Sequence, residues 1–81
     1  MTIRVLFFAS LANDVGCGEV SLNLSDNATV ADALLLLSRD YPAVARYRSR
    51  LATAVNLDYV GTDHGLSDGD ELAMIPPVSG G

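Results

Sequence analysis

The residues best suited to chemistry are the last two of the sequence, Gly80 and Gly81. Glycine has no Cβ, so a narrow channel in another protein can close around a Gly-Gly segment and reach the carboxylate at its end. We therefore expect Gly81 to carry the reacting carboxylate and Gly80 to allow access to it. The alternative is an inert end of the chain that frays, as most chain ends do.

The four residues before the glycines, Pro76-Pro77-Val78-Ser79, determine how this end leaves the rest of the chain. Two consecutive prolines fix φ and remove two backbone donors, so a strand cannot continue through them. They also favour a stiff, extended backbone. The sequence thus predicts a body over residues 1–75 and an extended tail over residues 76–81.

The other reactive side chains do not form a convincing catalytic set. Cys17 is the only cysteine, which excludes an internal disulfide and a metal site made of cysteines alone. His64 is the only histidine and cannot build a zinc site or a triad by itself. We interpret both as loop residues; a persulfide at Cys17 is the alternative for that position. Asp68 and Asp70 have the spacing of turn residues around a glycine, and no metal site is expected.

Composition narrows the class of protein. The chain has 81 residues, 49% of them hydrophobic, which is enough for the core of one domain. Its net charge is −5 and it contains no lysine, so nucleic acid and anionic membranes are unsuitable partners, whereas a basic cleft is suitable. No apolar run approaches the ~20 residues of a membrane span, and no signal peptide is recognisable, so we expect a cytoplasmic protein.

The first third of the chain has the pattern of a hairpin. Residues 3–9 are nearly all apolar and rich in β-branched and aromatic side chains, which predicts a central strand covered on both faces. Residues 10–18 contain two glycines, an asparagine and an aspartate, and we expect a loop. Residues 19–24 alternate between polar and apolar, as a half-exposed strand does.

A helix and three further strands follow. Thr29 and Asp32 have the spacing of a capping box, and apolar residues then recur at helical spacing until Pro42, which begins a second short helix. Arg46, Arg48 and Arg50 are expected on the solvated face of that second helix, where they could also contact an acidic partner. The remaining strands are predicted at residues 52–55, 59–60 and 71–75.

This order of elements predicts an α+β fold of the ubiquitin-like β-grasp type. The two most apolar strands are the first and the last, and we place them side by side and parallel at the centre of a mixed sheet of four to five strands. One main helix would cover one face of this sheet. A flexible tail would then leave directly from a central strand.

Four segments give the sequence a family resemblance: the opening I-R-V-L-F-F-A, Ala54-Val55-Asn56, L-S-D-G-D-E-L at residues 66–72, and the final P-P-V-S-G-G. Over essentially its whole length the chain resembles the small ubiquitin-like sulfur carriers, a family that includes the small subunit of molybdopterin synthase. The Pro-Pro pair is the most specific feature, because the related thiamine-pathway carriers usually lack it. The chain departs from the family at Ala12-Asn13, where a charged pair is common.

The resemblance implies a carrier that is not itself an enzyme and binds no cofactor permanently. An adenylyltransferase related to ubiquitin-activating enzymes would use MgATP to adenylate Gly81, and sulfur would then replace the adenylate to give a thiocarboxylate. The tail would enter the large catalytic subunit of the synthase, in a heterotetramer. Two carriers acting in turn would donate sulfur to a cyclic pyranopterin phosphate and form the dithiolene of molybdopterin.

The resemblance also implies that an apolar patch near the base of the tail contacts both partners. The matching residues are Phe8, Tyr59 and Ile75, although Phe8 and Ile75 could equally belong to the core. Three other functions stay open. The chain could carry sulfur for a thiamine or cysteine precursor, modify lysines of other proteins through Gly81, or be an interaction module with an inert tail.

Overall fold

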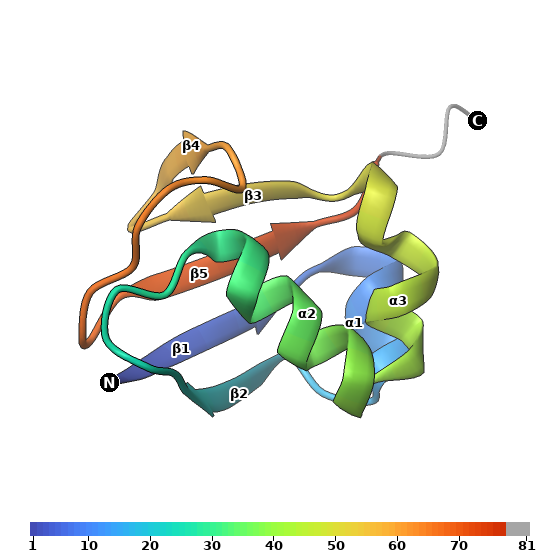
Figure 1. Cartoon of the computed structure of the whole chain (residues 1–81). Coiled ribbons are helices and arrows are strands. Elements are labelled where there is room, and N and C mark those ends of the chain that lie inside the picture. The colour runs from blue at the N-terminus through green and yellow to red at the C-terminus, as the bar shows by residue number, and fades with distance from the viewer. Residues whose placement is uncertain (78–81) are drawn as a thin grey trace.

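A mixed sheet of five strands forms one layer of the molecule, and its helices form the other (Figure 1). The computed structural model describes residues 1–77, and the predicted tail residues Val78, Ser79, Gly80 and Gly81 lie outside the described residues. The elements are β1 (Thr2–Phe7), α1 (Ala9–Val15), β2 (Glu19–Asn23), α2 (Val30–Asp40), α3 (Pro42–Tyr47), the short 3-10 helix η1 (Arg48–Arg50), β3 (Ala52–Val55), β4 (Asp58–Val60) and β5 (Glu71–Ile75). Within residues 1–77, every helix is too short or too polar to cross a bilayer.

The strand order is β2-β1-β5-β3-β4, which confirms the predicted ubiquitin-like β-grasp. The first and last strands lie side by side and parallel, with Val5 opposite Leu72, and the other pairs are antiparallel. A parallel pair requires a long crossover, which the middle of the chain supplies. As a result, β5 reaches its last residue at the centre of the sheet.

The core lies between the sheet and the helices. Ile3, Val5 and Phe7 of β1 are buried, and so are Leu72 and Met74 of β5. Along each strand, the residues that alternate with these buried ones point to the opposite face of the sheet. The prediction that the first strand is covered on both faces is therefore wrong. Its sequence is nearly all apolar, but all the helices pack on one side of the sheet and leave the other side uncovered by helix (Figure 1).

Helix α2 begins and ends as the sequence predicts. Asp32 donates its backbone N–H to Thr29 Oγ1 (3.3 Å), and Thr29 donates its own N–H to Asp32 Oδ2 (2.9 Å), which completes the capping box. The helix buries Val30, Ala33, Leu34 and Leu37 against the sheet. Tyr41 is extended because Pro42 follows it, and α3 starts at that proline.

The predicted loop over residues 10–18 is wrong, because Ala9–Val15 form helix α1. Asparagine, aspartate and glycine are poor helix formers, and they led to the loop prediction. The structure buries Leu11 completely, and a short helix gains most of its stability from such packing. Gly16 then ends the helix with φ of +97°, a conformation that glycine adopts without strain. The body therefore has three α-helices among residues 1–77, where one main helix and a second short helix were expected.

Candidate functional site

The sheet face without helices adjoins the point where the predicted tail begins. Strand β5 ends at Ile75, which lies opposite Ala52 of β3. Pro76 follows and is buried, whereas Pro77 is exposed. The base of the predicted tail is therefore held against the centre of the sheet, beside its uncovered face.

Phe8 and Ile75 lie next to each other on this uncovered face. Phe8 is extended and follows the buried Phe7, so its side chain continues the alternation to the open side, where it is 44% exposed. Ile75 follows the buried Met74 in the same way and is half-buried. Phe7 pairs with Met74, so the next step along both parallel strands brings Phe8 beside Ile75. Neither residue is part of the core between sheet and helices.

Tyr59 marks the far side of the same face. It is 75% exposed and lies opposite Ala54, which in turn pairs with Ala73, and Ala73 pairs with Leu6. Neighbouring strands are ~4.8 Å apart, so this row of four residues spans about 14 Å. Two alanines thus lie at the centre of the row, with larger apolar side chains at its ends.

We define the open face as the apolar residues on this side of the sheet, of which Ala54 is itself only 5% exposed: Leu6, Phe8, Ala52, Ala54, Tyr59, Ala73 and Ile75. Leu6, Ala52, Ala54 and Ala73 were missed by the sequence analysis. The period of two in residues 3–9 places Leu6 and Phe8 on one side, but the sequence does not say which side the helices cover.

An ion-pair network borders the open face at the end away from the tail. Arg4 Nη2 lies 3.2 Å from Glu71 Oε2 and 3.5 Å from Glu19 Oε1. Exposed pairs of this kind add little stability. Their effect is to set a charged border, so the apolar surface is limited to the half of the face nearest the predicted tail.

The turn between β3 and β4 is fastened to the start of β5 by Asn56. Its side-chain Nδ2 donates to Asp70 Oδ1 (3.0 Å), and its Oδ1 accepts the backbone N–H of Glu71 (3.0 Å). Its own backbone N–H donates to the Glu71 carbonyl oxygen (2.9 Å). The hairpin that carries Tyr59 is therefore held in a fixed position relative to the central strand.

We expect Asn56→Ala to lower the free energy of unfolding by about 1–2 kcal/mol, because it removes two side-chain hydrogen bonds from this turn. Urea denaturation followed by circular dichroism measures the change. Asn13→Ala, at an exposed position on α1, is the matched control and should alter stability by less than about 0.5 kcal/mol. Equal stability of the Asn56 variant and the control would show that the turn does not depend on these bonds.

Asp68 and Asp70 act as turn residues, as the sequence predicts. Asp68 Oδ1 accepts the backbone N–H of Thr2 (2.8 Å), and Asp70 Oδ2 accepts that of Ser67 (2.8 Å). Among residues 1–77, no group of three or more histidines, cysteines and acids has the arrangement needed to hold a metal ion. Cys17 is exposed just after α1, and His64 is exposed in the β4–β5 loop.

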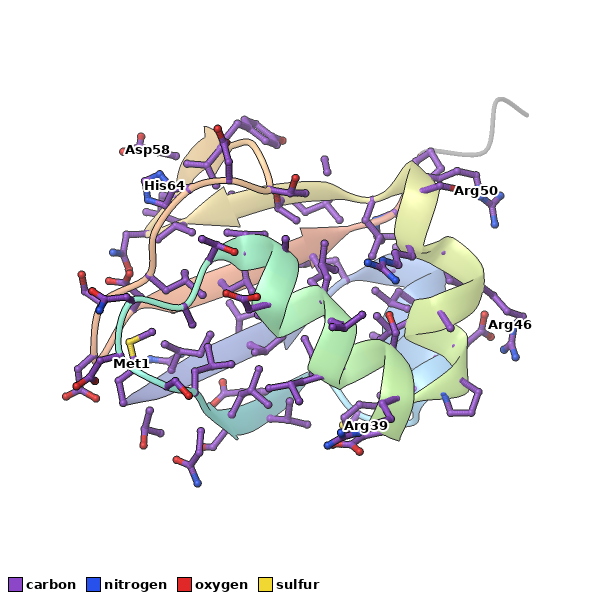
Figure 2. All side chains as sticks on the ribbon, viewed as in Figure 1. Met1, Arg39, Arg46, Arg50, Asp58 and His64 are labelled. Carbon is purple, nitrogen blue, oxygen red and sulfur yellow. The ribbon has the colours of Figure 1, made fainter. Side chains whose placement is uncertain are left out.

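His64 lies at the opposite end of the molecule from the base of the predicted tail, whereas arginines lie near that base. Figure 2 shows Arg46 and Arg50 at the end of the molecule where the chain leaves the sheet, and His64 with Asp58 at the opposite end. The Arg50 guanidinium lies over the Tyr47 ring, 5.2 Å from its centroid. Arg46, Arg48 and Arg50 are exposed, as predicted, but only Arg46 lies on α3, whereas Arg48 and Arg50 belong to η1.

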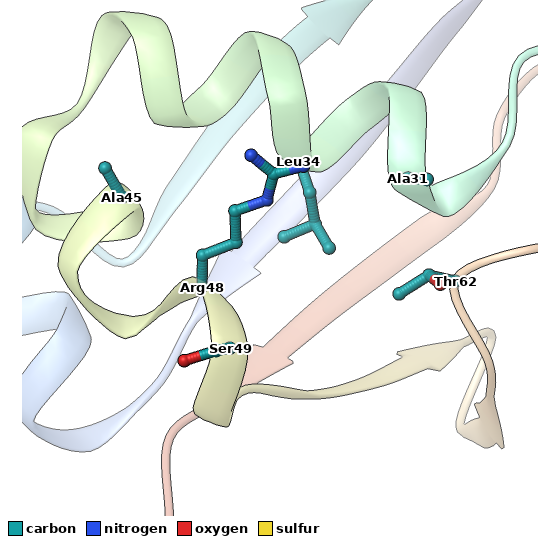
Figure 3. Close-up of a pocket in the computed structure, with 6 residues that line it drawn as sticks. All are labelled: Ala31, Leu34, Ala45, Arg48, Ser49 and Thr62. Atoms are coloured by element: carbon teal, nitrogen blue, oxygen red, sulfur yellow. The ribbon is translucent and has the colours of Figure 1, made fainter.

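A hollow of about 470 Å³ lies on the helical side of the molecule, between α2, η1 and the β4–β5 loop (Figure 3). Its lining residues are Ala31, Leu34, Ala45, Arg48, Ser49 and Thr62. Among the described residues that line the hollow, Arg48 is the one charged group, and none has a carboxylate, thiol or imidazole that could serve as a base. The open face is therefore the stronger candidate for function.

Comparison with known proteins supports the fold described above and identifies a family. The model of the ThiS family matches residues 5–81. The "molybdopterin synthase sulfur carrier subunit" of Escherichia coli is 42% identical over 98% of this chain and 99% of that protein. The crystal structure of SAMP1 from Haloferax volcanii has a TM-score of 0.90 at 31% identity and covers both chains completely. A chain of the BexX/CysO complex from Amycolatopsis orientalis has a TM-score of 0.72 at 26% identity, over 98% of this chain and 99% of that one.

Proposed function

The chain belongs to the ThiS family, and we propose that within it the chain serves as the sulfur-carrier subunit of a molybdopterin synthase. The observation that carries the proposal is the 42% identity to the Escherichia coli sulfur carrier subunit over nearly all of both chains. The Pro-Pro-Val-Ser-Gly-Gly segment is consistent with it, because Gly81 would supply the carboxylate that the function needs.

The proposed chemistry takes place at the carboxylate of Gly81. A carboxylate resists nucleophilic attack until it has a good leaving group, which an adenylyltransferase would provide. A carboxylate oxygen attacks the α-phosphate of MgATP and releases pyrophosphate, which gives an acyl-adenylate. A sulfide-equivalent nucleophile then attacks the carbonyl carbon and expels AMP, which leaves a thiocarboxylate.

The thiocarboxylate sulfur is a softer and stronger nucleophile than the oxygen it replaces. In the large catalytic subunit it would attack a carbon of a cyclic pyranopterin phosphate, and water would then cleave the resulting thioester at the Gly81 carbonyl, which leaves the sulfur on the pterin and restores the carboxylate. A second carrier would deliver the second sulfur of the dithiolene in the same way. The body would contribute no catalytic group to either step. Its part would be to bind the partner and direct the tail into the catalytic centre.

The open face supports a role in binding these partners. Phe8, Tyr59 and Ile75 project from it and are flanked by small residues, so that a partner can approach the sheet closely. Tyrosine and phenylalanine are enriched in the cores of protein interfaces. The net charge of −5 would attract a partner with basic pockets and speed the encounter more than it tightens the complex.

The intact mass of the protein provides the test of this function. The chain is incubated with its cognate activating enzyme, MgATP and a sulfur source. We expect a mass gain equal to the exchange of one oxygen for one sulfur, located by fragmentation in the C-terminal peptide. An unchanged mass in the presence of an active enzyme would refute the carrier function.

Gly80→Ala should slow this activation by at least about tenfold, because a methyl group at residue 80 would meet the walls of a channel shaped for glycine. The initial rate of thiocarboxylate formation measures the effect. Ser79→Ala, one residue earlier, is the matched control and should stay within about threefold of the parent rate. Equal rates for Gly80→Ala and the parent would contradict the role of Gly80 in access.

The likeness to SAMP1 supports a second candidate function, that of a protein modifier. Solved structures describe SAMP1 as a small archaeal modifier protein, and the two chains superpose over their full lengths. A modifier would join Gly81 to lysines of other proteins through bonds that withstand reducing agents. Expression of a tagged chain in its own host, followed by reducing electrophoresis, distinguishes the two: a ladder of larger adducts favours the modifier.

A further inference from the structure

We propose that Leu57, at the tip of the β3–β4 hairpin, is a binding residue that extends the open face and inserts into an apolar pocket of the large synthase subunit. The inference rests on the proposed function, which supplies the partner. It starts from two properties of Leu57 that do not stabilise the free chain. The side chain is 88% exposed, and its backbone has φ of +76°.

The backbone conformation of Leu57 is unfavourable for its residue type. Val55 pairs with Asp58, so Asn56 and Leu57 form a two-residue hairpin turn. Both have positive φ, +50° and +76°, as a type I′ turn requires. Asparagine is well suited to the first of these positions and glycine to the second, whereas a leucine there brings its Cβ close to the following carbonyl oxygen. Strain that the surrounding structure maintains is a feature of functional sites.

The surrounding structure does maintain this strain. Asn56 is fastened by three hydrogen bonds to Asp70 and Glu71, at the start of the central strand β5. The turn therefore cannot relax without loss of these bonds. A backbone held in this way loses little conformational entropy when the side chain that it carries enters a pocket, so the Leu57 backbone is preorganised for binding.

The position of Leu57 indicates which partner it meets. It stands two residues before Tyr59, about 7 Å along the chain, at the tip of the edge hairpin and toward the end of the sheet away from the predicted tail. Leu57 and Tyr59 are the two most exposed of the large hydrophobic residues among residues 1–77. A partner that covers Tyr59 would thus reach Leu57 with a small extension of the same contact.

The test measures binding and stability together, because the proposal predicts that they change independently. Leu57→Gly should keep or raise the Tm, by as much as about 5 °C, because glycine relieves the strain at the cost of some chain entropy. The same variant should weaken binding to the purified large synthase subunit of the same organism about 10- to 100-fold, the expected effect of losing one buried leucine. Isothermal titration calorimetry gives the Kd, and differential scanning calorimetry gives the Tm.

Two further variants separate the side chain from the backbone. Leu57→Asn tolerates positive φ but is polar, and it should weaken binding as much as Leu57→Gly does. Leu57→Met keeps an apolar side chain of similar size, and it should bind within about threefold of the parent. Retention of parent affinity by both Leu57→Gly and Leu57→Asn would overturn the proposal. Weaker binding by Leu57→Gly alone would assign the effect to the rigidity of the turn and would equally overturn the proposal.

Tyr59→Ala distinguishes failure of this inference from failure of the proposed function. If Tyr59→Ala weakens binding and the Leu57 variants do not, only the extension to Leu57 is wrong. If no variant of either residue weakens binding, the open face is not the docking surface for this subunit. Light scattering of the free chain tests for self-association. If the parent chain is a dimer and Leu57→Gly is a monomer, Leu57 is assigned to contacts between two copies instead.

Discussion

Deletion of Gly81 is expected to abolish sulfur transfer to the pterin, by more than about a thousandfold, while the body keeps its fold. The deletion leaves a carboxylate on Gly80, but the chain is then shorter by one residue, which is about 3.5 Å in extended form. Reacting atoms must approach to about 3–3.5 Å, and a displacement of 1 Å already costs about a hundredfold in rate. A carboxylate one residue short therefore misses both the nucleotide and the pterin.

Single-turnover conversion of the pterin precursor by the reconstituted synthase measures this effect. The Tm should match that of the parent, because every core residue lies between Ile3 and Met74. Cys17→Ser is the matched control, since Cys17 is the only other site that could carry sulfur, as a persulfide. We expect Cys17→Ser to retain full activity. Transfer that survives the loss of Gly81 and is lost with Cys17→Ser would move the chemistry from the tail to the thiol.

Ile75→Arg is expected to weaken binding to the large subunit by at least about a hundredfold. Ile75 lies at the centre of the open face beside Phe8, directly before the prolines that begin the predicted tail. An arginine there would carry a charge into the apolar centre of the contact, and truncation or disruption of such central residues costs about 2–4 kcal/mol. Binding is measured by calorimetry with purified large subunit.

Leu35→Arg is the matched control for this experiment. Leu35 is 57% exposed, but it lies on α2, on the other side of the sheet. The Leu35→Arg substitution introduces the same charge in place of a similar apolar side chain, so it should leave the affinity for the large subunit within about threefold of the parent value. Denaturation midpoints of both variants are needed because Ile75 is half-buried. Equal effects of the two substitutions would mean that charge, and not the open face, determines the affinity.

Local patterns were sufficient to predict most element boundaries. The strands at Ala52–Val55 and Glu71–Ile75 begin and end as predicted, and the Thr29–Asp32 capping box starts α2 with both of its hydrogen bonds. These boundaries depend on the φ restriction of proline and on hydrogen bonds between residues three apart. Such effects act within a few residues and are therefore visible in the sequence.

Helix α1 was not predictable in this way. Its sequence contains Asn13 and Asp14 and is followed by two glycines, all typical of a loop. The helix forms because Leu11 is buried completely against other parts of the chain. Burial of one residue by distant elements is a tertiary effect, and no pattern within residues 10–18 shows it.

The sequence by itself determined the β-grasp order of the strands, the family resemblance, and the Gly80-Gly81 segment to which the proposed chemistry is assigned. The tertiary structure decided which residues form the open face, since a strand of alternating side chains has two equivalent sides until the helices cover one of them. Only the packing of α1, α2 and α3 on one side left Phe8 and Ile75 outside the core, next to Leu6 and Ala73. The strained turn at Leu57 was likewise not visible in the sequence. Its backbone conformation is set by the pairing of β3 with β4 and by the hydrogen bonds of Asn56 to β5.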